Sequence, residues 1–99
     1  MKIRNINGTS DNACRCASWL EHWEKYNTGK QAVPVFCPVS DCENNPIVGA
    51  HVQKDDDSDQ SWYIVPLCMT CNSKTGQVLE VSDAIALAPA NVSQTCGKS

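Results

Sequence analysis

Large apolar side chains show helical spacing in the first third of the chain. Trp19, Trp23 and Tyr26 recur at intervals of three and four residues, which places them on one helix face. Ser18 followed by Glu21 has the form of a capping box, and an Asn-Thr-Gly run after the last aromatic residue has the form of a helix stop. The pattern predicts a helix over residues 18 to 27.

The residues before this helix carry no comparable period. The first twelve are polar and rich in Asn, Gly, Thr and Ser. Such a composition is typical of an arm or a fraying strand. We therefore expect residues 1–12 to be a flexible arm.

Two β-prone runs flank an acidic segment in the middle of the chain. Residues 47–52 and 61–65 are rich in Ile, Val, Trp and Tyr, and the acidic residues between them, 55–59, are typical of a solvated loop. This order predicts a β-hairpin whose second strand ends at Pro66. A shorter β-prone run, residues 32–36, leads into the first cysteine pair.

The chain after the hairpin is predicted to contain short elements only. Cys68 and Cys71 are expected to open a helix, and residues 78–81 to form a final strand. Ser82 is a good cap for a further short helix over residues 83–88.

Four cysteines form two close pairs, and both pairs have spacings typical of metal ligands. The pairs are Cys37 with Cys42 and Cys68 with Cys71. A cysteine knuckle, a hairpin and a short helix, in this order, are typical of a treble-clef zinc finger. We therefore expect a small α+β treble-clef fold with an added N-terminal helix, in which four thiolates hold one structural Zn²⁺. Two disulfides or simple buried thiols are the alternative.

Length and charge limit the other possibilities. A chain of 99 residues is expected to be one domain, with a flexible arm at 1–12, a folded zinc-binding core at 14–88 and a tail at 89–99. The net charge is −3 and the eight Lys and Arg residues are scattered, which argues against strong non-specific binding to a phosphate backbone. The N-terminus lacks the apolar segment of a secretory signal, and no apolar run approaches the ~20 residues that span a bilayer. We expect a cytoplasmic protein without a membrane partner or a small-molecule cofactor.

The segment from Cys37 to Lys74 resembles the zinc-bound branch of the HNH (His-Me finger) nucleases, most closely the recombination-endonuclease VII type. The resemblance is carried by the two cysteine pairs, by Ala50-His51 at the place of an Asp-His pair, and by Leu67-Cys68-Met69-Thr70-Cys71-Asn72. It covers about two fifths of the chain.

The resemblance implies roles for two further residues. His51 would be the general base that takes a proton from water, and Asn72 would be one ligand of a catalytic Mg²⁺ or Mn²⁺. The family has an Asp directly before the histidine, where this chain has Ala50. An amide oxygen alone is a poor site for Mg²⁺, which is usually held by one or two carboxylates. Asp55 or Asp56 would have to fold back to replace the missing one.

Each of these residues also has a structural interpretation. His51 lies in an otherwise apolar strand, where a histidine is often a core residue with a hydrogen-bond partner. Asn72 lies where an asparagine readily satisfies backbone groups at a helix start.

A second group of metal-ligand residue types lies near the predicted N-terminal helix. Cys14, Cys16 and His22 would form a second metal site if His51 or Cys96 completed it. The alternative is an aromatic cluster around His22, which shares the helix face of the aromatic residues, and the Cys-x-Cys spacing favours this alternative. Cys96 is then a spare thiol.

Three functions are compatible with these features. The first is a zinc-stabilised module that binds nucleic acid or protein and does not cut. The second is a metal-dependent HNH endonuclease that uses His51 and recruits a carboxylate from elsewhere. The third is a small acidic accessory or inhibitor protein. The alanine at position 50 favours the first and third over the second.

Overall fold

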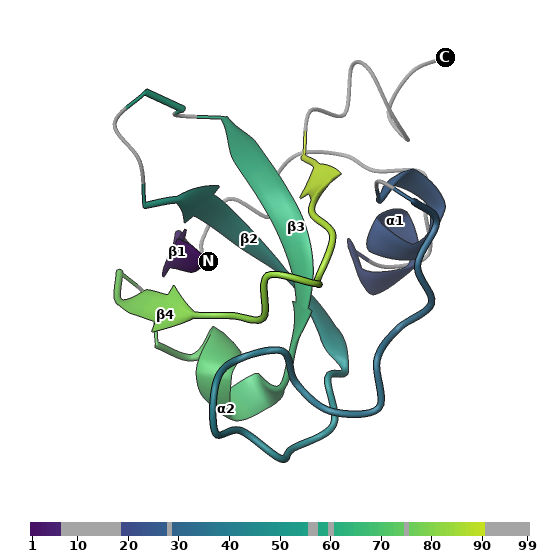
Figure 1. The fold of residues 1–99 in the computed structure, drawn as a ribbon, viewed down its shortest axis with the longest axis horizontal. Helices are drawn as coiled ribbons and strands as arrows, with labels where there is room; N and C mark the ends of the chain where they lie inside the picture. Colours follow the sequence, from purple (N-terminus) through teal and green to yellow (C-terminus); the bar gives the residue numbers. More distant parts are fainter. Residues whose placement is uncertain (7–18, 28, 56–57, 60, 75, 91–99) are drawn as a thin grey trace.

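The computed structural model describes residues 1–6, 19–27, 29–55, 58–59, 61–74 and 76–90. Figure 1 shows α1 beside the long β2–β3 hairpin and α2 at the end of that hairpin. The small α+β class expected from the sequence is confirmed. In chain order the elements are β1 (Lys2–Asn5), α1 (Trp19–Tyr26), β2 (Val48–Lys54), β3 (Trp62–Leu67), α2 (Met69–Asn72), β4 (Val78–Glu80) and β5 (Ala88–Pro89).

The strands form one antiparallel sheet in the order β4-β1-β2-β3-β5. The β2–β3 pair is the longest, and its register runs from Val48 opposite Leu67 to Gln53 opposite Trp62. The predicted hairpin is thus confirmed, and the acidic segment forms its connection.

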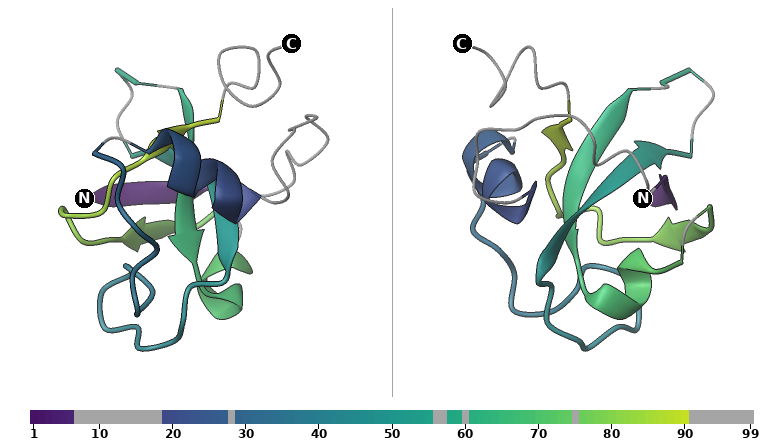
Figure 2. Two further views of the ribbon diagram at one scale, coloured as in Figure 1. Left: turned by 90° about the vertical axis from the view of Figure 1, so that its right-hand side faces the viewer. Right: turned by 180° about the vertical axis from the view of Figure 1, so that it is seen from behind.

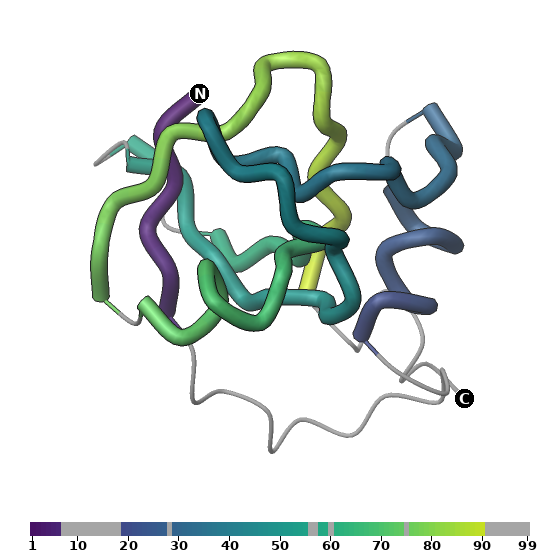
Figure 3. Tube along the Cα trace, turned by 90° about the horizontal axis from the view of Figure 1, so that it is seen from below, coloured from purple at the N-terminus to yellow at the C-terminus, as the bar shows by residue number. Residues whose placement is uncertain are grey.

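Strand β1 corrects the arm predicted at the N-terminus. Ile3 pairs with Lys54 of β2 and with Leu79 of β4, and its side chain is fully buried. Figure 3 shows β1, in purple, lying beside β4. Exposed and buried positions alternate in β1, but one of its two buried residues is the polar Asn5, so the sequence shows no alternation of apolar and polar residues that would indicate a strand. Residues 7–12 of the predicted arm lie outside the described residues.

Pro66 lies inside β3 and does not end it, contrary to the sequence prediction. The backbone of Trp62 faces β5, because its carbonyl accepts the N–H of Ala90 at 3.0 Å. Alternate residues of a strand direct their backbone groups to the same edge, so Pro66 faces the β5 side too. The described pairing of β5 involves only Tyr63 and Ile64, so the missing N–H of Pro66 costs no hydrogen bond there.

The helix predicted over residues 83–88 is also wrong. The hydroxyl of Ser82 accepts the N–H of Ala84 at 3.2 Å, and the chain makes a turn and then extends into β5. A Ser side chain that satisfies a backbone N–H two residues on supports a turn as well as a helix cap. Residues 89 and 90, the expected start of the tail, belong to the folded part, because Pro89 lies in β5 and Ala90 is buried, and the rest of the expected tail lies outside the described residues.

Two apolar clusters fill the space around the hairpin. One surrounds the four cysteines and includes Ile3, Val52 and Leu67, while the other includes Trp23, Ile64 and Ala88. The indole N–H of Trp23 donates to the carbonyl of Ala86 at 2.9 Å. The views in Figure 2 show α1 against one face of the hairpin. Neither helix of the described chain has the length and apolar character needed to cross a membrane.

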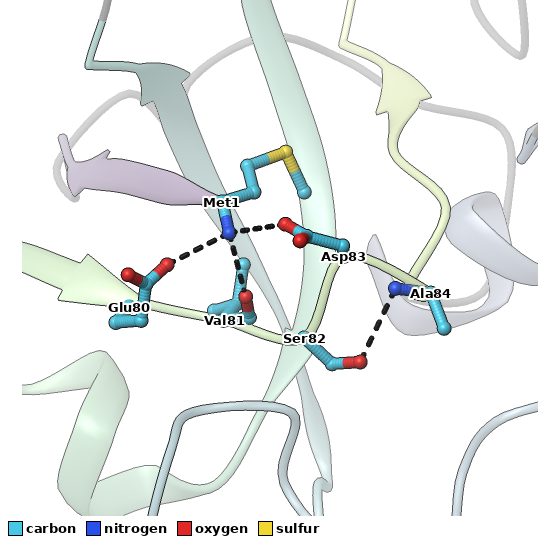
Figure 4. A network of polar contacts seen from close by, with 6 residues as sticks. All are labelled: Met1, Glu80, Val81, Ser82, Asp83 and Ala84. Atoms are coloured by element: carbon cyan, nitrogen blue, oxygen red, sulfur yellow. Dashed lines mark hydrogen bonds and ion pairs between the residues drawn. The ribbon is translucent and has the colours of Figure 1, made fainter.

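The ammonium group of Met1 joins β1 to the segment after β4. It donates to the Glu80 carboxylate at 2.7 Å, to the Val81 carbonyl at 3.0 Å and to the Asp83 carboxylate (Figure 4). The pKa of this ammonium is raised, first by the hydrogen bonds to the two carboxylates. These contacts hold β4 beside β1 at the edge of the sheet.

Candidate metal centre

The first cysteine pair lies on a knuckle between α1 and β2. The N–H of Cys37 donates to the Asn44 carbonyl at 2.7 Å, and the N–H of Cys42 donates to the Val39 carbonyl at 3.1 Å. Asp41, between them, has a φ of +62°, a left-handed conformation that Asp tolerates better than most residues. The β-prone segment 32–36 forms no strand in the described structure and leads into the knuckle.

The second pair opens α2, as the sequence predicts. Cys68 is the N-cap residue, with φ −75° and ψ 165°, and its sulfur accepts the N–H of Cys71 at 3.4 Å. This is the position where a cap side chain satisfies an N–H group that has no partner within the helix. Both side chains are buried.

The fold brings the two pairs together. The four sulfur atoms all lie within 4.8 Å of one another, and the Cys42 sulfur is 3.7 Å from those of Cys68 and Cys71. Four thiolates around Zn²⁺, at about 2.3 Å each, place neighbouring sulfurs about 3.8 Å apart. The four residues form no disulfide. The cluster can therefore hold one metal ion, and its spacing fits a tetrahedral thiolate site.

The cysteine thiols differ in the hydrogen bonds that they receive, and the pKa values of Cys37, Cys68 and Cys71 differ as well. Burial raises the pKa of Cys68, but hydrogen bonds from Cys71 and from the Asn44 amide outweigh burial and lower that pKa to about 7. Burial raises the pKa of Cys37 and, more strongly, that of Cys71. A bound cation would supply the positive charge that keeps such buried thiols deprotonated.

Two asparagines that the sequence analysis did not single out support this cluster. Asn44 donates to the Cys68 sulfur at 3.7 Å, while its carbonyl binds the knuckle as described above. Asn5 of β1 is fully buried, and its amide donates to the Asn72 carbonyl at 2.8 Å and to the Cys71 carbonyl at 3.4 Å. No local pattern indicates either role, because each depends on a contact with a distant segment.

His51 lies beside Ala50 in the sequence but on the other face of β2. Ala50 is buried in the cysteine cluster, whereas the His51 ring makes an edge contact with Trp19 of α1, with ring centroids 4.5 Å apart. His51 is only 5% exposed, and its Nε2 has no hydrogen-bond partner within the described chain. Burial, and then the nearby His22, lower the pKa of His51, so the ring is neutral near pH 7.

The beginning of α1 rests directly on β2. A Cβ added at Gly49 would meet the backbone of Trp19 at 2.4 Å and that of Leu20 at 2.6 Å. Only a glycine permits this approach, and the approach holds Trp19 over His51.

Asn72 lies near this contact. Its side-chain oxygen is buried and has no hydrogen-bond partner in the described part of the structure. The residue lines a hollow of about 280 Å³ together with Trp19, Leu20, Ile47, Val48 and Gly49. The side-chain oxygen of Asn72 therefore does not satisfy a backbone N–H group, although the structural interpretation of the sequence expected this role.

Asp55, a candidate for the missing carboxylate, is engaged elsewhere, because it forms an ion pair with Arg4 at 3.3 Å. Asp56 lies outside the described residues.

His22 is part of an aromatic cluster, in agreement with one of the two interpretations of its sequence surroundings. Its ring centroid lies 5.0 Å from that of Trp19 and 4.9 Å from that of Tyr26. Its Nε2 lies 2.7 Å from the Pro89 carbonyl, so this nitrogen carries the proton and donates it. Cys14, Cys16 and Cys96 lie outside the described residues, and the second metal site remains a prediction.

Searches of protein-family models, of curated proteins and of solved structures find no match to this chain. The likeness to HNH nucleases therefore rests on the motif residues alone.

Proposed function

We propose that this chain is a zinc-stabilised binding module of the treble-clef type that does not cut nucleic acid. The observation that carries the proposal is the convergence of four cysteine sulfurs within 4.8 Å. Four thiolates complete a tetrahedral Zn²⁺ site and leave no position for a reactive water. The order of knuckle, hairpin and α2 supports the treble-clef assignment. The ion would connect the knuckle to the start of α2, two segments that share a modest apolar core.

The surroundings of His51 support a non-cutting role. A general base must reach the proton that it removes. His51 is instead buried beneath Trp19, and Ala50 offers no carboxylate for a divalent ion. We infer an HNH-like scaffold in which the hairpin and the cysteine frame are kept without the catalytic centre.

Charge favours a protein as the binding partner. Arg4, Lys25 and Lys54 each form an ion pair with a carboxylate, at 3.3, 3.0 and 3.5 Å respectively. Cations paired in this way, on a chain of net charge −3, offer little to a phosphate backbone. Apolar side chains are available instead, since Val35 is 71% exposed and Met69 is 61% exposed. The role of a small acidic accessory or inhibitor protein is one form of this proposal, and nucleic-acid binding is the alternative.

One observation favours a residual endonuclease. The unpartnered oxygen of Asn72 is the ligand atom that the nuclease interpretation needs for Mg²⁺ or Mn²⁺. Asn72 lines a hollow, yet none of the described residues that line this hollow carries a carboxylate.

Metal analysis tests the proposed centre. Protein purified without added chelator is expected to contain one zinc per chain, with four thiols protected from modification until the zinc is removed. Substantially less than one metal ion per chain, with all seven cysteines reactive, would contradict the proposal.

A nicking assay on supercoiled DNA with Mg²⁺ or Mn²⁺ tests the absence of cutting. Wild type and His51→Ala are expected to give the same background. The variant Ala50→Asp restores the carboxylate of the family pattern, and cutting by this variant alone would identify the scaffold as nuclease-derived. Cutting by the wild type that His51→Ala abolishes would establish the endonuclease instead.

A further inference from the structure

We propose that Cys42 is the reactive thiolate of the metal-loaded centre, the site at which a neutral oxidant such as hydrogen peroxide attacks. The inference rests on the proposed zinc site and concerns its chemical asymmetry. It assigns a modification site, a co-reactant and a disulfide product to a cluster whose four members otherwise have the same role.

Solvent access distinguishes Cys42 from its neighbours. Cys37 is 4% exposed, and Cys68 and Cys71 are each 3% exposed, whereas Cys42 is only partly buried. An electrophile must reach the sulfur before it can react. Three of the four sulfurs are shielded from this approach by the protein itself.

Hydrogen bonding also distinguishes Cys42 from Cys37 and Cys68. Cys68 accepts the N–H of Cys71 at 3.4 Å and the Asn44 amide at 3.7 Å, and Cys37 accepts the N–H of Cys68 at 3.5 Å. Such bonds stabilise the negative charge of a thiolate and lower its nucleophilicity. Within the described chain, the polar neighbours of the Cys42 sulfur are other sulfurs, and no nitrogen donates to it. Cys71 also lacks a nitrogen donor but is buried, so among the four cysteines it is Cys42 that combines partial solvent access with a sulfur that accepts no N–H.

The charges beside Cys42 select the kind of reagent. Asp41 and Glu43 flank it and both are exposed, so their carboxylates repel an anionic reagent. A small neutral molecule such as peroxide meets no such barrier.

The reaction can be written with its balance. The Cys42 thiolate attacks one oxygen of hydrogen peroxide, an S–O bond forms, the O–O bond breaks and hydroxide leaves, so the sulfur is oxidised by two electrons to the sulfenic acid level. The sulfur of Cys71, 3.7 Å away, then attacks this sulfur and displaces the oxygen as hydroxide. With two protons from solvent, one peroxide yields one disulfide and two waters. Cys71 is the better resolving group because Cys68 is the thiolate with two nitrogen donors.

Loss of two thiolates from a four-thiolate site removes half of its ligands. Oxidation at Cys42 is therefore expected to release the zinc and to unfold the knuckle, and a reductant with added zinc is expected to restore both.

The test begins with protein shown to contain one zinc per chain. It is treated with a small excess of hydrogen peroxide, quenched with N-ethylmaleimide and digested, and fragment ions assign the state of each cysteine. We expect a disulfide between Cys42 and Cys71, with zinc release measured by a chromogenic chelator at the same rate. Cys14, Cys16 and Cys96 are scored separately.

A matched pair of alkylating agents provides the second readout. Neutral iodoacetamide is expected to modify Cys42 before Cys37, Cys68 or Cys71, and anionic iodoacetate to react more slowly than it does with a free thiol. In Asp41→Asn/Glu43→Gln the rate with iodoacetate is expected to rise about tenfold, while the rate with iodoacetamide changes little. This control does not alter a ligand.

The outcomes separate the inference from the proposed function. One zinc per chain with first modification at Cys37, Cys68 or Cys71 would overturn the assignment of Cys42 and leave the metal centre intact. Absence of zinc would overturn the metal centre and this inference with it.

Discussion

The two faces of strand β2 use polar side chains in opposite ways. On the face of Ala50, four cysteine sulfurs from two distant segments converge within 4.8 Å. On the face of His51, two buried histidines both contact the ring of Trp19, and both have a lowered pKa. Several metal-ligand atoms that converge can bind an ion, whereas single ligand atoms that are buried among apolar groups only become part of the core. The comparison indicates a candidate metal site on one face of β2 and, on the other face, two histidines that are too buried to act as accessible bases.

The strongest test of this comparison removes a ligand from the cysteine face. Cys71→Ser is expected to abolish cooperative folding, because apparent binding energies of structural zinc, about 10–16 kcal/mol in small peptides, match or exceed the total stability of a small domain. Circular dichroism and thermal melting would measure the loss. Cys96→Ser, at the predicted spare thiol, is the control and is expected to melt as the wild type does. A Cys71→Ser protein with an unchanged melt would show that the cluster holds no structural metal.

The next largest effect is expected on the His51 face. In Gly49→Ala the new methyl group would lie 2.4 Å from the backbone of Trp19, so α1 must move away from β2. Displacement of a packed helix is expected to cost about 2–3 kcal/mol, in the range of other overpacked sites. Gly29→Ala is a suitable comparison, because its Cβ would meet nothing within 4 Å and only its φ of +83° is unfavourable. Chemical denaturation would contradict this account if Gly49→Ala cost less than Gly29→Ala.

Asn44 allows a finer change on the cysteine face. Asn44→Ala removes the amide that donates to Cys68 and keeps the carbonyl that binds the knuckle. Loss of such an outer contact typically weakens metal binding by 10–100-fold, and for this exposed residue we expect about tenfold. Competition with a chromogenic chelator would measure the change. Asn45→Ala, whose amide donates to the Val35 carbonyl, is a control outside the cluster. Equal affinity in wild type and Asn44→Ala would remove Asn44 from the metal site.

The smallest expected effect is a pH dependence from the His51 face. Burial lowers the pKa of His51 in the folded chain below the ordinary value of 6.5. The unfolded chain then takes up a proton first as the pH falls, so the contribution to stability is complete above pH 6.5 and is lost progressively below it. In His51→Gln the fall in stability between pH 7.5 and about 5.5 should be shallower than in the wild type. Identical slopes in urea titrations would show that His51 does not remain neutral when buried.

Local sequence patterns were sufficient to predict the features that depend on residues close together in the chain. The spacing of Cys37 and Cys42 and that of Cys68 and Cys71 predicted two ligand pairs, and the structure brings the pairs together. The aromatic spacing predicted α1, and the β-prone runs predicted the hairpin.

The features that were missed depend on partners far away in the chain. Strand β1 could not be predicted from its own residues, because it is formed by pairing with β2 and β4 on either side. Pro66 fits inside β3 because the described pairing of β5 does not extend to Pro66. Nothing in the order of residues indicates that Trp19 covers His51, since the contact depends on how closely α1 approaches Gly49. The structure thus changed the interpretation of the histidine and left that of the cysteines in place.

The position of β1 also has a consequence for the order of folding. Its partner β4 lies more than seventy residues further along the chain, whereas the four cysteines fall within 35 consecutive residues. Closing the shorter loop costs less chain entropy, so a metal-bound hairpin and α2 can form while β1 is still unpaired. During synthesis β1 leaves the ribosome before β2 and β4, and it is expected to dock only after β4 has followed. Insertion of β1 between β2 and β4 is therefore expected as a slow phase of refolding whose rate does not depend on zinc concentration.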